Sequence, residues 1–105
     1  MEFNKIDNAV IKAFFVALQQ NDQRNFEQLL APAIRFTHNG QIEDIHQWAA
    51  TFFFCNQPAK FVSIEKVEAN TIWAQLLIDG PGIVPVKLSF TIVNEKISAF
   101  DAGRQ

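Results

Sequence analysis

The side chain best suited to acid–base chemistry in this sequence is the imidazole of His38. His38 follows Ile34 and Phe36 at alternate positions, so the three side chains share one face of a predicted strand over residues 33–38. We expect this face to point inward and to bring the imidazole to the strand end, where a pocket would open. An imidazole has an ordinary pKa of about 6.5, which suits a general base near neutral pH. The sequence favours His38 as a catalytic residue; the alternative is a structural histidine that bonds a backbone carbonyl.

Glu65 is a weaker candidate because its role depends on the pairing of two strands. A turn at residues 69–70 would pair Val67 with Ile72 and Glu65 with Ala74. Glu65 would then face the interior, where burial raises the pKa of a carboxyl group toward useful acid–base values. A shift of one residue in this pairing would turn Glu65 to solvent instead.

Helical periodicity in the first half of the chain predicts the elements that surround His38. A first helix is expected over residues 5–20 with Asn4 as its cap, and a second from Asp22 until Pro32 ends it. After the strand over residues 33–38, Asn39-Gly40 is a tight-turn signal. The third helix is expected over residues 43–54, with an apolar stripe of Ile45, Trp48, Ala49 and Phe52.

Alternating residues in the second half predict an antiparallel sheet. Four strands are expected, over residues 60–68, 71–79, 84–93 and 96–102. One face of the middle two strands is apolar and needs cover; it comprises Ile72, Ala74, Leu76, Ile78, Val84, Val86, Leu88 and Phe90. The three helices are the available cover. The predicted fold is therefore α+β, with helices packed on one face of a curved, mostly antiparallel sheet of four to five strands.

Composition limits the classes of function open to this chain. Its 105 residues suit a single domain, spanning residues 1–105, and a net charge of −2 supplies no basic surface for nucleic acid or an anionic membrane. No apolar run approaches the roughly 20 residues of a membrane helix. The single cysteine, Cys55, cannot form an internal disulfide, so a cytoplasmic location is expected. We expect Cys55 to be a small buried hydrophobic residue.

No motif for a metal, nucleotide or other cofactor is present in the sequence. It contains no CxxC, HExxH, phosphate-binding glycine loop or nucleophile elbow. The two histidines, His38 and His46, are eight residues apart on different predicted elements, and His46 lies off the apolar stripe of its helix. We therefore expect neither metal nor cofactor, and a solvent-facing His46.

Three segments together resemble a known superfamily: FFVALQQNDQRNFEQLLAPAIRFTHNG over residues 14–40, EDIHQWAATFF over residues 43–53, and NEKISAF over residues 94–100. Their order of elements is similar to the nuclear transport factor 2-like superfamily, and in particular to its SnoaL-like polyketide cyclase and ketosteroid isomerase branch. The resemblance implies a cone-shaped fold with a deep pocket between sheet and helices, often in a dimer. It implies no single activity, because this fold carries isomerases, dehydratases, cyclases and non-catalytic binders.

The resemblance also has consequences for individual residues. His38 falls where the steroid isomerases carry their general-base carboxylate. Phe14 and Val84 fall near the positions of the two oxyanion donors, and neither side chain can donate a hydrogen bond, which argues against steroid-isomerase-type enolisation. Asp101 is similar in placement to the acidic residue near the chain end of SnoaL-like cyclases. Phe100 is the more natural inward residue of that strand, however, which would turn Asp101 outward.

Two functions from different classes remain open. The first is a small-molecule-binding protein whose apolar pocket lies between the first helix, the third helix and the inner sheet face, with His38 as the base of an isomerase-, cyclase- or dehydratase-type reaction. The expected lining is Phe14, Trp48, Phe52, Val84 and Phe100, although aromatic residues at such spacings are often plain core. The second is a non-catalytic dimeric interaction module with a filled pocket. A homodimer is expected through an apolar outer sheet face that comprises Val62, Ile64, Trp73, Gln75 and Leu77.

Overall fold

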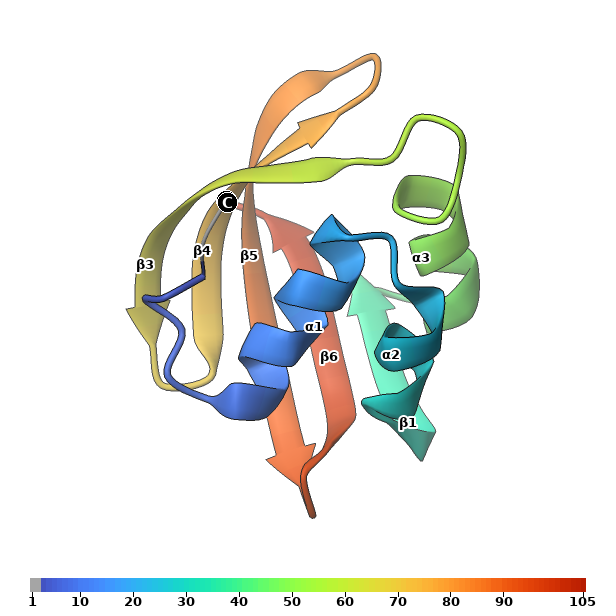
Figure 1. The fold of residues 1–105 in the computed structure, drawn as a ribbon, viewed down its shortest axis with the longest axis vertical. Helices are drawn as coiled ribbons and strands as arrows, with labels where there is room; N and C mark the ends of the chain where they lie inside the picture. The colour runs from blue at the N-terminus through green and yellow to red at the C-terminus, as the bar shows by residue number, and fades with distance from the viewer. Residues whose placement is uncertain (1–2) are drawn as a thin grey trace.

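The computed structural model describes residues 3–105 as three helices and one six-stranded sheet. The helices are α1 (Ala9–Gln19), α2 (Gln23–Gln28) and α3 (Ile45–Phe52). The strands are β1 (Leu30–His38), β2 (Gln41–Ile42), β3 (Lys60–Glu68), β4 (Thr71–Ile78), β5 (Gly82–Val93) and β6 (Lys96–Arg104), in the spatial order β2-β1-β6-β5-β4-β3. Figure 1 shows the helices on one side of a curved, open sheet, with α1 lying across β5 and β6. The predicted α+β class is confirmed, and the strand count is higher than predicted.

The helices begin at side-chain caps, and two of the three begin later than expected. Asn8, not Asn4, caps α1, because its Oδ1 accepts hydrogen bonds from the amides of Val10 and Ile11 at 2.9 and 3.1 Å. Asp22 caps α2 as predicted. The third predicted helix starts at residue 45 rather than 43, because Asp44 is its cap and accepts from the amide of His46 at 2.8 Å.

The end of α2 differs from the prediction. Pro32 does not end this helix: α2 stops at Gln28, and Pro32 lies inside β1, which starts at Leu30. The pairing of β1 with β6 is irregular between Leu30 and Arg35, and this irregularity accommodates a residue that lacks a backbone N–H.

Two pairings of β1 determine where His38 lies. β1 runs parallel to β6, with His38 opposite Ala102, so segments from the two ends of the chain meet at one sheet position. The predicted turn at Asn39-Gly40 is also present, with φ angles of 52° and 82°, and it returns the chain along β1 as the short strand β2. The sequence analysis did not predict β2.

The C-terminal meander follows the predicted alternation closely. The limits of β3 are those predicted, and those of β4, β5 and β6 differ by one or two residues at an end. Of the apolar face predicted for β4 and β5, every member is buried except Ile78, which is partly buried. This face meets the helices as predicted.

A bulge in β3 overturns the prediction for Glu65. Val67 pairs with Ile72 as predicted, but the register then shifts between Ile64 and Lys66, so that Ile64 faces Ala74. Glu65 is the extra residue of this bulge; it is exposed, and its carboxylate accepts a hydrogen bond from Ser63 Oγ at 2.8 Å. The same shift turns Ile64 inward, where it is 5% exposed, so Ile64 does not belong to the outer face.

Cys55 also differs from its prediction. It lies in the loop after α3 and is exposed, not a buried hydrophobic residue. In the described part of the chain, no helix combines the length and hydropathy that a membrane span requires.

Candidate functional site

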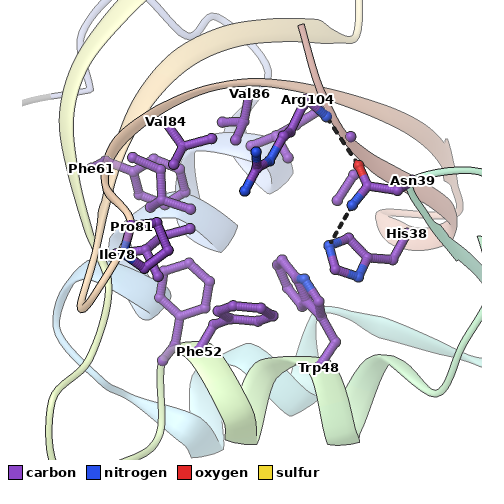
Figure 2. Close-up of a pocket in the computed structure, with 15 residues that line it drawn as sticks. His38, Asn39, Trp48, Phe52, Phe61, Ile78, Pro81, Val84, Val86 and Arg104 are labelled. Carbon is purple, nitrogen blue, oxygen red and sulfur yellow. Dashed lines mark hydrogen bonds between the residues drawn. The ribbon is translucent and has the colours of Figure 1, made fainter.

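A cavity of about 280 Å³ lies between α3 and the inner face of the sheet, near the end of β1. Aromatic side chains of α3 line one side, and aliphatic side chains of β4 and β5 line the other; they include Trp48, Phe52, Leu76, Val84 and Val86. Figure 2 shows Trp48, Phe52, Val84 and Val86 around a common space. The lining residues come from α3 and the sheet; contrary to the expectation, α1 contributes none.

Phe14 and Phe100 were expected in the lining and are core residues instead. Phe14 is fully buried, with its ring centroid 5.0 Å from that of Phe100 and 5.1 Å from that of Phe90. Phe100 is 2% exposed and stacks on Phe90 at 4.7 Å. These ring contacts fill the space between α1 and the sheet at Phe14, and neither Phe14 nor Phe100 lines the cavity beside α3. Three of the expected lining residues, Trp48, Phe52 and Val84, do line the cavity.

His38 lies on the cavity wall, at the end of β1. Its side chain is 24% exposed. Three aromatic rings hold the imidazole: Phe36 is parallel to it at 6.4 Å, while Trp48 and Phe52 meet it edge-on at 6.4 and 5.9 Å. One edge of the imidazole therefore faces the apolar space.

Glu43 is a partner of His38 that the sequence analysis did not identify. Both of its carboxylate oxygens lie 3.2 Å from His38 Nδ1. The turn at Asn39-Gly40 brings Glu43 to this position, because it returns the chain along β1. The backbone amide of Glu43 then donates to the carbonyl of Phe36 at 3.4 Å. An ionised carboxylate only accepts hydrogen bonds, so Nδ1 carries the proton that it donates to Glu43.

Asn39 supports the same assignment from the other side of the ring. Its Oδ1 accepts a hydrogen bond from the backbone amide of Arg104 at 3.2 Å, which leaves its Nδ2 to donate. This Nδ2 lies 3.4 Å from His38 Nε2, as Figure 2 shows. The network therefore gives the neutral imidazole a proton on Nδ1 and a lone pair on Nε2. Since 3.4 Å is a long hydrogen bond, Nε2 is only weakly engaged.

Arg104 is a second site residue that the sequence analysis missed. The last strand was expected to end near Ala102, but β6 continues to Arg104, which pairs with the inward-facing Val86. Phe100, Ala102 and Arg104 therefore share the inner face, so extending the alternation by two residues would have found it. Figure 2 shows its side chain directed into the space that the lining residues enclose.

The remaining acidic candidate, Asp101, lies outside this cavity. It is exposed on the opposite face of the sheet, as the inward orientation of Phe100 predicts, and its carboxylate accepts a hydrogen bond from Thr37 Oγ1. The exposed Glu65 is likewise not among the residues that line the cavity. Of the three predicted acid–base residues, His38 therefore lines the cavity without Glu65 or Asp101. The polar residues near His38 are Glu43, Asn39 and Arg104 instead.

A second histidine–carboxylate pair lies on the surface. His46 is exposed as predicted, and its Nδ1 lies 2.6 and 2.7 Å from the carboxylate oxygens of Glu27. It provides a matched reference for the pair in the cavity, since it has the same chemistry but borders no apolar space. Within residues 3–105, no group of three histidine, cysteine or acidic side chains is placed to hold a metal ion.

The comparisons with solved structures identify the fold. A candidate polyketide cyclase from Sinorhizobium meliloti is 20% identical with a TM-score of 0.72, over 91% of this chain and 94% of that one. A nuclear transport factor 2-like protein from Cytophaga hutchinsonii is 12% identical with a TM-score of 0.70, over 91% and 87%. A candidate ketosteroid isomerase from Kribbella flavida is 12% identical with a TM-score of 0.74, over 92% and 76%.

These likenesses show that the chain has the nuclear transport factor 2-like fold, as its sequence resemblance predicts. No family model and no curated protein sequence matches the chain. Because this fold carries many activities, the function has to be argued from the residues around the cavity.

Proposed function

We propose that this protein binds a small apolar molecule in the cavity beside His38 and uses His38 as a general base. The observation that carries the proposal is the carboxylate of Glu43 at 3.2 Å from His38 Nδ1, on the wall of a cavity of about 280 Å³. A base needs a lone pair that can reach the substrate. The hydrogen bond from Nδ1 to Glu43 leaves the lone pair of the ring on Nε2, where its one protein contact among the described residues is the long 3.4 Å hydrogen bond from Asn39 Nδ2, which a substrate would displace.

The pair of side chains is suited to proton transfer from carbon. When Nε2 takes a proton the ring becomes an imidazolium, and the negative charge of Glu43 stabilises it without moving. Removal of a proton from carbon is a step that isomerase-, cyclase- and dehydratase-type reactions share. The names of the similar structures, a polyketide cyclase and a ketosteroid isomerase among them, are consistent with chemistry of this type. The proposal leaves the natural substrate open.

The base can be tested with 5-nitrobenzisoxazole, a flat apolar probe. A base removes the proton from its ring carbon, the N–O bond breaks, and the product is a coloured cyanophenolate. We expect the wild-type protein to saturate with the probe and to accelerate the reaction. The His38→Gln variant should lose about 100-fold in rate, the lower end of the range for a positioned base.

The matched control for this experiment is His46→Gln. His46 also pairs with a carboxylate but lies outside the cavity, so this variant should keep the wild-type rate within about twofold. A rate that His38→Gln leaves unchanged would remove the catalytic proposal. A wild-type rate that rises linearly with probe concentration, with no saturation, would contradict binding in the cavity.

We also propose that two copies of the chain form a homodimer through the outer face of the sheet. The same interface would serve the alternative function, a non-catalytic interaction module. Val62 and Leu77 are each 45% exposed and Ile83 is 58% exposed, and Leu77 lies directly opposite Ile83 in the pairing of β4 with β5. Such an exposed apolar group favours an interface. Trp73 lies between Lys66 and Lys87, whose ammonium groups are 4.8 and 5.5 Å from its ring. These lysines and Gln75 would form the polar rim.

A further inference from the structure

The cavity is apolar on one side and carries polar groups on the other. In Figure 2, Phe61, Ile78 and Pro81 lie across the enclosed space from His38 and Asn39. Arg104 is a charged side chain in the lining and joins the polar side, and among residues 3–105 no carboxylate lines the cavity. A ligand that fits this arrangement has an apolar body and one polar end.

Arg104 supplies the positive charge and most of the hydrogen-bond donors on this side. Arg104 presents a guanidinium group, which carries five N–H donors in a planar array and no acceptor. In the described chain, no carboxylate forms a salt bridge with Arg104, whereas Lys66 on the outer face pairs with Glu68 at 2.8 Å. Arg104 is exposed, and since no described carboxylate pairs with its guanidinium group, that group is free to bind an anionic ligand.

Trp48 adds a second, independent observation. Its side chain is buried, with 6% of the residue exposed, and it lines the same cavity. A buried indole N–H usually has a hydrogen-bond acceptor. Among residues 3–105, no protein group accepts a hydrogen bond from Trp48 Nε1, and this atom is not sealed from solvent; the indole lines the cavity in Figure 2. An acceptor on a bound ligand would satisfy it.

We propose that the ligand is an apolar carboxylate, with its anionic group bound by the guanidinium of Arg104 and its apolar body between α3 and the β4–β5 face. This inference rests on the proposed function, because it assigns a chemical class to the molecule in the same cavity. An apolar cavity of about 150 Å³ holds benzene, so about 280 Å³ suits one or two rings. Arginine binds carboxylates through two parallel hydrogen bonds, a geometry that a neutral group does not reproduce.

The test compares naphthalene-2-carboxylate with naphthalene-2-carboxamide, which share a body but differ in charge. Isothermal titration calorimetry should show the carboxylate binding about tenfold more tightly than the amide. Arg104→Gln should weaken carboxylate binding about tenfold and leave amide binding within twofold. The carboxylate should also inhibit the reaction of 5-nitrobenzisoxazole by competition, because both molecules occupy one cavity.

The matched control is Arg35→Gln, an exposed arginine that does not line this cavity. This variant should bind both probes as the wild type does. Equal affinities for carboxylate and amide would overturn the anion assignment alone and leave the apolar binding site standing. A carboxylate preference that survives Arg104→Gln would overturn the role of Arg104. Failure of both probes to bind would overturn the binding proposal itself, and the inference with it.

Discussion

Replacing Glu43 with glutamine should slow proton removal by His38 while leaving the cavity intact. The side chain keeps its length, and one amide oxygen can still accept from Nδ1, but the negative charge beside the ring is lost. Glu43 is a positioning residue here, because it contacts His38 and not the ligand. We therefore expect a lower kcat for 5-nitrobenzisoxazole and an almost unchanged KM.

The magnitude follows from distance and exposure. Two unit charges about 4 Å apart attract by about 1 kcal/mol in water and about 4 kcal/mol at an effective dielectric constant of 20. The side chains of His38 and Glu43 are 24% and 41% exposed, so water screens the pair and the lower part of that range applies. A loss of about 1.4 kcal/mol of transition-state stabilisation corresponds to about a tenfold lower kcat.

The assay is a comparison of steady-state rates for Glu43→Gln and for Glu27→Gln, its matched control. Glu27 has the same relation to His46, so Glu27→Gln removes an equivalent charge outside the cavity and should not change kcat. Circular dichroism should show that both variants remain folded. A kcat for Glu43→Gln equal to that of the wild type, alongside a large loss for His38→Gln, would refute the role assigned to the Glu43 charge.

Three further predictions concern stability and assembly. Phe14→Ala should lower the free energy of unfolding by about 3–5 kcal/mol in urea denaturation, because Phe14 is fully buried among phenylalanine rings; a loss below about 1 kcal/mol would contradict its place in the core. Glu95→Gly should raise that free energy by about 0.5–1 kcal/mol, since Glu95 has a φ of 61° in the turn before β6, and a lower melting temperature would count against this. Sedimentation at micromolar concentration should give the dimer mass for the wild type and for Val93→Glu, an exposed apolar position outside the outer-face group, but a lower mass for Leu77→Glu. A monomeric wild type would contradict the dimer.

Alternation along the strands was enough to predict much of the fold. The apolar positions of β4 and β5 specify one buried face, and the parity of Ile34, Phe36 and His38 places the imidazole on the inner side of β1. The same reasoning failed at β3, because a bulge inserts one residue and reverses the facing of Ile64 and Glu65. A bulge depends on the partner strand and leaves no periodic signal in the sequence.

The composition of the site was harder to predict because it depends on pairings between distant segments. Glu43 reaches His38 only through the hairpin of β1 and β2, and β2 is too short to show a period. Arg104 comes beside Asn39 only because β6 pairs in parallel with β1, a contact across 65 positions of sequence. Likewise, Phe14 is buried and Trp48 lines a cavity because α1 and α3 lie at different distances from the sheet. Helical periodicity in the sequence does not predict these distances.

The proposed function requires the lone pair of His38 Nε2 to face a molecule bound in the cavity. Long-range ¹H–¹⁵N spectra of the two histidine side chains test it most directly, recorded where both rings are neutral, without and with naphthalene-2-carboxylate. We expect a proton on Nδ1 of His38. We also expect the resonance of His38 Nε2 to shift with saturation as the probe is added, while the signals of His46 stay in place. A proton on His38 Nε2 in the free protein, or an Nε2 signal that does not respond to a bound probe, would contradict it.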